Sequence, residues 1–263
     1  MHVALLSDFS SASRHMLDYA AMLFQNQEVR FTILHVKTPC TASKCAGKCD
    51  IIFQQKLKKE KSWLQNKGYT EKQIEIKFIE GSYIESMRQF VTEQHVDLIL
   101  IGSSSQKIFN TGFFFDKKTL EVVTKVKCSV VLVPEDVPLH IPQNALLPTD
   151  FSITSDYSTF NILTSLAFVN NTHLSLITTR HNMTLGPNKA HAKDLISRVI
   201  NSLEFKSVKE VQSTLKAAYL NKYDLVMIMA KNLSIFKELF STTSDTKFQP
   251  EVPFLFLHDS KTI

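Results

Sequence analysis

Three cysteines lie within ten residues of one another. Cys40, Cys45 and Cys49 are separated by four and three residues. Clustered thiolates bind zinc or exchange disulfides, although zinc sites usually contain closer pairs, with only two residues between the cysteines. His35 is the histidine nearest in sequence, and the adjacent lysines would favour thiolates in an exposed loop. Three interpretations stay open: a loop whose cysteines have no specific role, a redox sensor, and a metal site formed by Cys40, Cys45 and Cys49.

A second polar group follows an apolar segment. Gly102, Ser103, Ser104 and Ser105 come directly after residues 97–101, which read as a buried strand. Ligands of open parallel sheets bind at the carboxyl ends of the strands, and glycine lets the main chain approach an anion closely. These four residues therefore form a candidate anion or nucleotide site. A polar loop that binds nothing is the alternative.

The tripeptide Asp-Phe-Ser occurs twice. Residues 3–10 read VALLSDFS and residues 145–152 read ALLPTDFS, so Asp8 and Asp150 each follow an apolar strand. An aspartate at a strand-to-helix turn either caps the loop or lies beside a ligand. The spacing of the two copies is that of a whole domain, which indicates a duplication rather than a short repeat.

Apolar strands alternate with helical patterns along the first half. Ser10 or Ser11 is a suitable N-cap for the first helix. The residues of the segment 74–79 alternate between apolar and polar, as in an edge strand. The expected strands are 3–6, 31–36, 74–79, 97–101 and 129–133, and the expected helices lie near 12–24, 51–66, 84–91 and 119–126.

The second half repeats this plan. Its expected strands are 145–147, 174–178, 225–229 and 254–257, with a weaker candidate at 207–211. Pro134, Pro138 and Pro142 interrupt regular structure between the halves. The sequence thus predicts an α/β fold of two tandem open parallel-sheet domains, residues 1–134 and 144–263, joined by a linker at 135–143, with helices on both faces.

Composition excludes several classes of function. Hydrophobic residues make up 44% and charged residues 21% of the 263 residues, as in globular proteins with real cores. Apolar runs stay well short of the roughly 20 residues that a membrane helix needs. The lysine clusters behind the net charge of +5 are interleaved with acidic residues, so we expect neither nucleic acid nor membrane as a partner. A cytoplasmic location is expected.

Taken in order, these segments resemble the universal stress proteins. The segments that carry the resemblance are 147–152 with its counterpart 8–10, Leu34-His35-Val36, 97–102 and 127–134. The resemblance implies a Rossmann-like fold of the adenine nucleotide α-hydrolase type. It also implies that the last strands of the two halves, 129–133 and 254–257, pair within one chain. A homodimer and an unidentified protein partner are further expectations.

ATP-binding members of that family hold phosphates with a loop of glycine, two residues, glycine, nine residues, then glycine and serine or threonine. In the first half only Gly102 matches. Ser105 takes the second glycine position, and Asp116-Lys117 takes the final pair, with one extra residue in the intervening stretch. By resemblance, the candidate nucleotide-binding residues are Asp8, Val36, Gly102, Ser103, Ser104, Ser105, Lys117 and Lys118.

The loop is eroded further in the second half. Its one glycine, Gly186, is remote from the loop, Ala230 stands where Gly102 is expected, and Phe240-Ser241 replaces the final pair. The sequence therefore predicts no triphosphate there.

A catalytic motif does not stand out. We expect a binding or regulatory module of the stress response rather than an enzyme, with no cofactor. Two alternatives remain: an ATP or AMP sensor that uses the first half only, with at most slow hydrolysis, and a thiol or zinc sensor at the cysteine loop.

Overall fold

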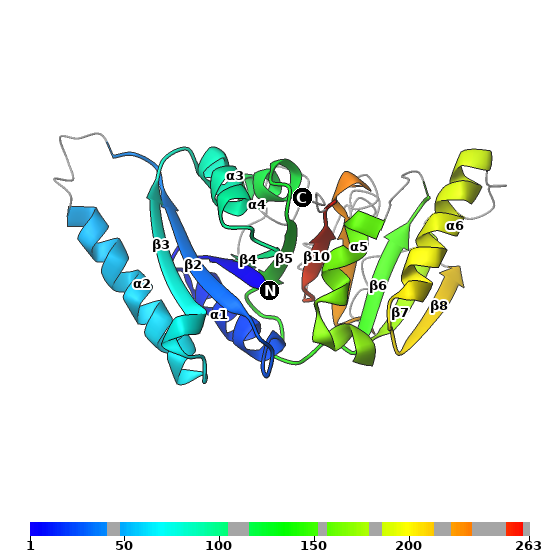
Figure 1. Ribbon diagram of the computed structural model, residues 1–263, viewed down its shortest axis with the longest axis horizontal. Coiled ribbons are helices and arrows are strands. Elements are labelled where there is room, and N and C mark those ends of the chain that lie inside the picture. Colours follow the sequence, from blue (N-terminus) through cyan, green and yellow to red (C-terminus); the bar gives the residue numbers. More distant parts are fainter. Residues whose placement is uncertain are drawn as a thin grey trace, which may run out of the picture.

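The computed structural model describes residues 1–40, 48–104, 116–151, 157–178, 186–212, 222–232 and 251–259. These residues form one ten-stranded sheet in the order β3-β2-β1-β4-β5-β10-β9-β6-β7-β8. Figure 1 shows helices on both faces of this long, open sheet. The predicted α/β class with a mostly parallel, open sheet is confirmed.

The first half contains five strands and four helices among the described residues. Ser10 caps the first helix, because its side chain accepts a hydrogen bond from Ser13 N. β3 is an edge strand, as its alternating sequence predicts. The elements are β1 His2–Leu6, α1 Ser11–Leu23, β2 Arg30–Lys37, α2 Lys48–Asn66, η1 Glu71–Gln73, β3 Ile74–Glu80, α3 Tyr83–Glu93, β4 Leu98–Ser103, α4 Lys117–Lys125 and β5 Ser129–Pro134.

The second half has the same strand order about the centre of the sheet. Its order β10-β9-β6-β7-β8 mirrors β5-β4-β1-β2-β3, and the weakly predicted strand 207–211 forms the other edge as β8. The elements are β6 Asn144–Thr149, α5 Tyr157–Thr164, η2 Ala167–Asn171, β7 His173–Thr178, α6 Pro187–Ser202, β8 Ser207–Gln212, β9 Leu225–Met229, η4 Ala230–Asn232 and β10 Phe254–Leu257.

Two apolar layers sandwich the sheet. One contains side chains from α1, α2, α5 and α6, and the other contains side chains from α3 and α4. The central strands are buried along their whole length because both of their faces are covered. In the part of the chain that is described, no helix has both the length and the apolar character needed to cross a membrane.

The halves meet through β5 and β10, the segments named above. These two strands pair antiparallel, with Phe254 opposite Leu132 and Phe256 opposite Val130, whereas every other neighbouring pair in the sheet is parallel. The antiparallel seam makes the sheet continuous across the molecule. Because strand direction reverses at this seam, the carboxyl ends of the strands in one half lie on the same side of the sheet as the amino ends of the strands in the other half.

Small structural details recur in both halves. Phe9 and Phe151 have φ angles of 65° and 54°, in the left-handed region. The N–H of each donates to a hydroxyl two residues earlier, Ser7 Oγ or Thr149 Oγ1, at 3.1 Å in both cases. The turn after the first strand of each half is therefore built in the same way.

Candidate functional site

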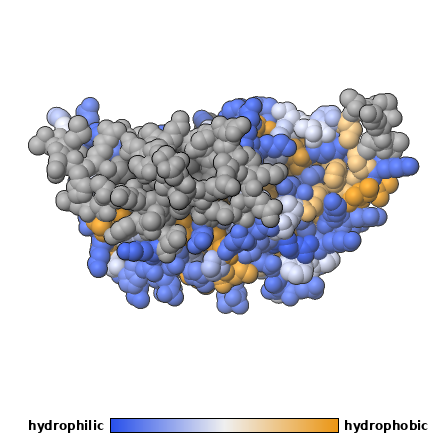
Figure 2. Space-filling view, turned by 180° about the vertical axis from the view of Figure 1, so that it is seen from behind, coloured by the Kyte–Doolittle hydropathy of each residue, from blue (hydrophilic) through white to orange (hydrophobic). Residues whose placement is uncertain are grey.

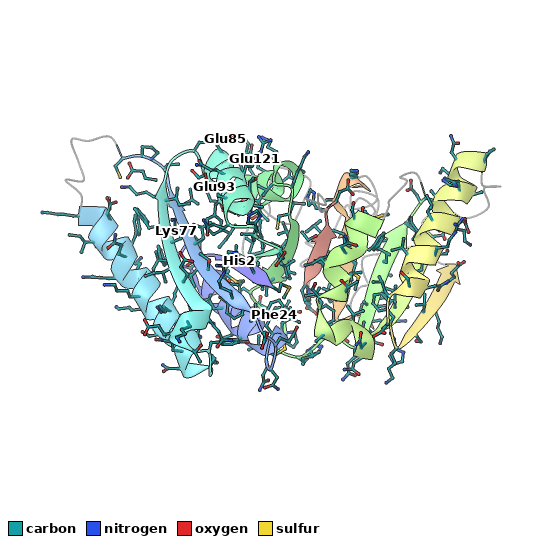
Figure 3. All side chains as sticks on the ribbon, viewed as in Figure 1. His2, Phe24, Lys77, Glu85, Glu93 and Glu121 are labelled. Atoms are coloured by element: carbon teal, nitrogen blue, oxygen red, sulfur yellow. The ribbon has the colours of Figure 1, made fainter. Side chains whose placement is uncertain are left out.

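The carboxyl ends of β1, β2 and β4 form the predicted site edge of the first half. β1 lies between β2 and β4, and the connections from β1 lead away in both directions, so this is the switch point where open sheets bind ligands. Figure 3 labels His2, which begins β1, and Phe24, the C-cap that follows α1; both lie away from this site. Ser105 lies outside the described residues.

Asp8 is engaged in the turn between β1 and α1. Its Oδ1 accepts hydrogen bonds from Ser10 N at 3.0 Å and from the hydroxyl of Ser13. Burial alone would raise the pKa of Asp8, but these hydrogen bonds hold it below its usual value. The carboxylate is exposed and ionised, and its role in this structure is to hold the turn.

Gly102 is required by helix packing. A Cβ atom at this position would lie 2.3 Å from Ala12 O, 2.5 Å from Ala12 C and 2.8 Å from Ser13 N. The first turn of α1 therefore rests directly on the main chain of β4. The retained glycine has a structural reason that does not involve phosphate.

The neighbouring candidates belong to the sheet and its core. Ser103 pairs with Pro134 in the β4–β5 ladder, and its carbonyl accepts a hydrogen bond from Glu135 N at 2.9 Å. Val36 packs against the apolar layer that contains α3 and α4. Ser104 follows β4 directly. Of these three, only Ser104 lies in the loop beyond the strands.

Asp116 caps α4. Its Oδ1 accepts a hydrogen bond from Thr119 N at 2.8 Å, and its Oδ2 one from Thr119 Oγ1 at 3.3 Å. A helix N-terminus is the usual place for a phosphate, and here a carboxylate of this chain occupies it. Lys117 and Lys118 are exposed, and Lys118 Nζ lies 5.4 Å from the centroid of the Tyr83 ring.

An aromatic cluster at the same edge was missed in the sequence. The ring of Phe9 lies 4.5 Å from that of His35 and 5.7 Å from that of Phe53, and Phe78 adjoins both of these partners. Lys56 Nζ lies 5.1 Å from the Phe9 centroid. Phe9 comes from the turn after β1, His35 from β2, Phe78 from β3 and Phe53 from α2. In the sequence, only the position of Phe9, between a strand and a helix N-cap, could have indicated this cluster.

The charges of the site nearly balance. Burial lowers the pKa of His35, although its hydrogen bond to the carbonyl of Ser7 and the charge of Asp8 act in the opposite direction, and Lys56 and Lys118 add to the fall. Burial also raises the pKa of Tyr83, with contributions from Asp116 and Asp8. Two carboxylates and two ammonium groups thus face one region around neutral rings.

The buried carboxyl of Glu60 contacts the turn after β1 through Ser7. The hydroxyl of Ser7 donates to Glu60 Oε1 at 2.7 Å, and Glu60 is 3% exposed. Glu60 Oε2 and Arg14 Nε are buried without a hydrogen-bond partner among the described residues. Burial raises the pKa of Glu60, while the hydrogen bond from Ser7 and the charge of Arg14 lower it. The ionised form is therefore disfavoured in the folded protein.

Replacing Glu60 by glutamine is expected to stabilise the protein at neutral pH. The folded-state pKa of Glu60 is raised, so its stability contribution is present below the unfolded value of 4.5 and is lost as the pH rises through the folded value. Glutamine keeps the hydrogen bond from Ser7 without the charge. Urea unfolding at pH 4.5 and 7.5 should show an advantage for Glu60→Gln, on the order of 1 kcal/mol, at the higher pH only.

The matched control for Glu60 is Glu71, whose side chain is 78% exposed beside Lys61. Glu71→Gln should change stability little at either pH. The opposite result would be a loss of stability in Glu60→Gln that is larger at pH 7.5 than at pH 4.5. It would show that the carboxyl is ionised and stabilises the folded protein, contrary to this account.

The cysteine group is only partly described, because Cys45 lies outside the described residues. Cys40 carries a free thiol, Cys49 takes part in a disulfide, and the two Sγ atoms lie 3.7 Å apart. Cys128 is buried, as its apolar surroundings predict. The described residues contain no group of three or more side chains able to hold a metal ion.

The register of the second half corrects one assignment. Leu98 pairs with Val3, five residues before Asp8, and Leu225 pairs with Ala145, five residues before Asp150. Four residues further along, Met229 rather than Ala230 occupies the place of Gly102. The expectation for Ala230 was wrong by one position because it was aligned on the end of the strand.

The second edge differs at the place of Gly102. Met229 is 2% exposed there, and Ala230 begins the 3-10 helix η4. Phe240 and Ser241 lie outside the described residues.

Solved structures share this architecture. A universal stress protein from Archaeoglobus fulgidus DSM 4304 superposes with a TM-score of 0.67 at 16% identity, covering 98% of both chains. A putative universal stress protein from Pseudomonas aeruginosa UCBPP-PA14 gives 0.54 at 9% identity, and a functionally unknown protein from P. aeruginosa PAO1 gives 0.53 at 10%; each alignment covers 97% of this chain and 92% of the other. At these identities the likeness concerns the fold.

The sequence has no match among curated proteins. Residues 1–134, however, match the universal stress protein family. This segment holds β1 to β5 and the whole edge with Asp8, Gly102 and Asp116. With its tertiary arrangement shared over the full length by the A. fulgidus protein, the chain belongs to the universal stress protein family.

Proposed function

We propose that the protein is a non-catalytic binding or regulatory module of the stress response that holds no nucleoside triphosphate at either site edge. The observation that carries this proposal is Asp116 at the N-terminus of α4. A carboxylate that accepts from Thr119 N uses a donor that an anion would need, and its charge repels a phosphate group.

Further contacts at the first edge support the proposal. Asp8 and Ser10 already accept hydrogen bonds from Ser10 N and Ser13 N at the start of α1. The position that a Cβ would take at Gly102 faces Ala12 instead of an open loop. Lys56 and Lys118 are balanced by Asp8 and Asp116, so the region offers little net positive charge to a triphosphate. In the second half, the buried Met229 stands in place of the glycine.

Titration calorimetry with MgATP tests the proposal. The wild-type protein is expected to show no binding tighter than about 1 mM, since each factor of ten in affinity needs about 1.4 kcal/mol that these contacts do not supply. Mass spectrometry of small molecules released from the purified protein should detect no adenosine phosphate.

The control for this titration is Asp8→Asn, which keeps the turn's shape and removes one charge. A micromolar Kd for the wild type that changes tenfold or more in either direction in Asp8→Asn would place a nucleotide at the first edge and refute the proposal. Gly102 is unsuitable for this purpose, because any side chain there collides with α1 whether or not a ligand binds.

An ATP or AMP sensor confined to the first half is the second candidate. The aromatic faces of Phe9 and Tyr83, each with an ammonium group within 5.5 Å of the ring centroid, favour it, as do the retained Asp8 and Gly102. The same titration with MgATP and AMP distinguishes the two. The cytoplasmic location and a homodimer stay predictions.

A further inference from the structure

A cavity of about 400 Å³ lies at the seam between the two halves. The residues that line it come from the end of α3, the turn before β4, the start of β5, the helix α5 and the residues that follow β10. It is therefore at the amino ends of β4 and β5, away from the edge that holds Asp8 and Gly102. Ligand cavities in proteins span about 300 to 1,000 Å³, so this one has room for a small organic molecule.

The apolar wall of the cavity is recessed. Val91, Val96 and Ile162 form this wall and are 9%, 8% and 9% exposed. By contrast, the exposed side chains of Ile51 and Ile52 lie at the end of the molecule that carries α2, where Figure 2 shows hydrophobic surface. A recessed apolar wall suits the body of a small ligand, whereas exposed apolar patches are typical of contacts with other macromolecules.

His258 is held in one orientation across the seam. Its main-chain N–H donates to Ser129 Oγ at 3.2 Å, and its Nε2 lies 2.5 Å from the carbonyl oxygen of Val123. A carbonyl only accepts, so Nε2 carries the hydrogen. Burial lowers the pKa of His258, although the hydrogen bond to Val123 and the charge of Asp259 act in the opposite direction, so the ring is neutral at pH 7.5. Its Nδ1 is then an acceptor, and it has no partner in the part of the chain that is described.

Asp97 supplies a second acceptor to the cavity. Its Oδ2 accepts from His2 N at 2.7 Å, while its Oδ1 has no partner among the described residues. Asp224 occupies the equivalent position in the second half, and its Oδ1 contacts His140 Nε2 at 3.1 Å. His140 belongs to the linker, which lines the corresponding cavity of about 270 Å³. The second half thus shows that a nitrogen bearing hydrogen is a suitable partner for this carboxylate.

The charges that line the cavity are of both signs. Asp259 is already engaged, because its two oxygens contact Thr159 Oγ1 and Lys231 Nζ. Lys127 is exposed, and none of the described residues pairs with it. Asp97 and Lys127 therefore present one carboxylate and one ammonium group beside the apolar wall. A ligand that matches this lining carries both charges and an apolar body.

We propose that the seam cavity binds an α-amino acid with an apolar side chain. The ammonium group of the ligand donates to Asp97 Oδ1 and His258 Nδ1, its carboxylate pairs with Lys127, and its side chain packs against the apolar wall. A simple amine would leave Lys127 unpaired, and a simple carboxylate would leave Asp97 unpaired. The proposal does not depend on the nucleotide question, since the cavity lies away from the carboxyl ends of β1, β2 and β4.

Titration calorimetry of the full-length protein with L-leucine and L-phenylalanine tests the proposal. We expect a Kd below about 1 mM for at least one of them at pH 7.5. The compounds 3-methylbutylamine and 4-methylpentanoate are leucine without its carboxylate and leucine without its amine. Each should bind at least tenfold more weakly than leucine, because each leaves one charge of the cavity without a partner.

Two variants with matched controls locate the binding. Asp97→Asn keeps an oxygen for His2 N but replaces the second acceptor by a donor, so the affinity for the amino acid should fall at least tenfold. Asp224→Asn, at the equivalent position beside the linker, should bind as the wild type does. Lys127→Gln should weaken binding several-fold, whereas Lys125→Gln, which breaks an exposed ion pair on α4, should leave it unchanged. Circular dichroism checks that each variant is folded.

Three results would overturn the proposal. The first is that neither amino acid binds at concentrations up to about 10 mM. The second is equal affinity for leucine and 3-methylbutylamine, which would show that the carboxylate is not recognised. The third is unchanged affinity in folded Asp97→Asn, which would place the amino acid outside this cavity.

Discussion

Replacing Gly102 by alanine is expected to destabilise the protein by about 3 kcal/mol, the upper part of the range for forced overpacking. The added Cβ would meet main-chain atoms of Ala12 and Ser13 at 2.3 to 2.8 Å, and a main chain cannot rotate away as a flexible side chain does. Either α1 must lift from β4 or the strand must shift, and both changes open the apolar layer beneath α1. Urea unfolding followed by circular dichroism measures the loss.

Gly186 provides the matched control for Gly102. A Cβ there would meet no atom within 4 Å, and the residue is the N-cap of α6, where alanine is a poorer cap than glycine. Gly186→Ala should therefore cost about 1 kcal/mol, well below the loss expected for Gly102→Ala. If Gly102→Ala were as stable as Gly186→Ala, the close approach of α1 to β4 would be wrong, and the glycine would need another explanation.

Replacing Asp224 by alanine is expected to cost about 2 kcal/mol. Its Oδ2 accepts hydrogen bonds from Gln143 N and Asn144 N, both at 2.9 Å, and its Oδ1 contacts His140 Nε2 at 3.1 Å. Hydrogen bonds to a charged group contribute about 1.5 to 3 kcal/mol each, reduced here because the side chain is 23% exposed and partly screened. The carboxylate therefore fixes the end of the linker and the first residue of β6 to the residue that directly precedes β9.

The first half contains a counterpart with fewer contacts. Asp97 Oδ2 accepts from His2 N at 2.7 Å, as Asp224 Oδ2 accepts from Asn144 N, and both aspartates directly precede a central strand. Asp97→Ala should therefore cost about half as much as Asp224→Ala, on the order of 1 kcal/mol. Equal losses in the two variants would show that the contacts to Gln143 and His140 contribute nothing.

The effect of Asp224 should depend on pH. Burial alone would raise the pKa of Asp224, but the hydrogen bonds from Gln143, His140 and Asn144 hold it below its ordinary value of 3.8. A carboxyl with a depressed folded-state pKa stabilises above the unfolded value, and this contribution disappears as the pH falls through the folded value. The difference between wild type and Asp224→Ala should therefore shrink below about pH 4.

These aspartates also show why the repeat was visible in the sequence only as a strand pattern. The segments 97–101 and 224–229 share an aspartate followed by apolar residues, and this pattern predicted both strands. It did not reveal that each aspartate reaches back to the first residue of the neighbouring strand, because that contact joins positions about 80 to 95 residues apart. The assignment of Ala230 instead of Met229 had a local cause, because counting five residues on from Asp97 and from Asp224 gives Gly102 and Met229.

The candidate site divides in the same way. Asp8, Gly102 and Asp116 were found from their positions at strand ends and in the eroded glycine loop. Phe53, Glu60 and Tyr83 were not found, because each lies on a helix whose direction over the sheet is set by packing. A phenylalanine or glutamate on a charged helix reads as a core or surface residue until its neighbours are known.

The sequence by itself determined the alternation of strands and helices, the edge strand β3, the duplication signal and the loss of the glycine loop. These are local properties, carried by periodicity and by residue types at strand ends. Only the tertiary structure decided what Gly102, Asp116 and Cys40 do. Gly102 is needed for α1, Asp116 caps α4, and Cys40 lies against Cys49, because each role depends on main chain or sulfur atoms brought together by the packing of helices on the sheet.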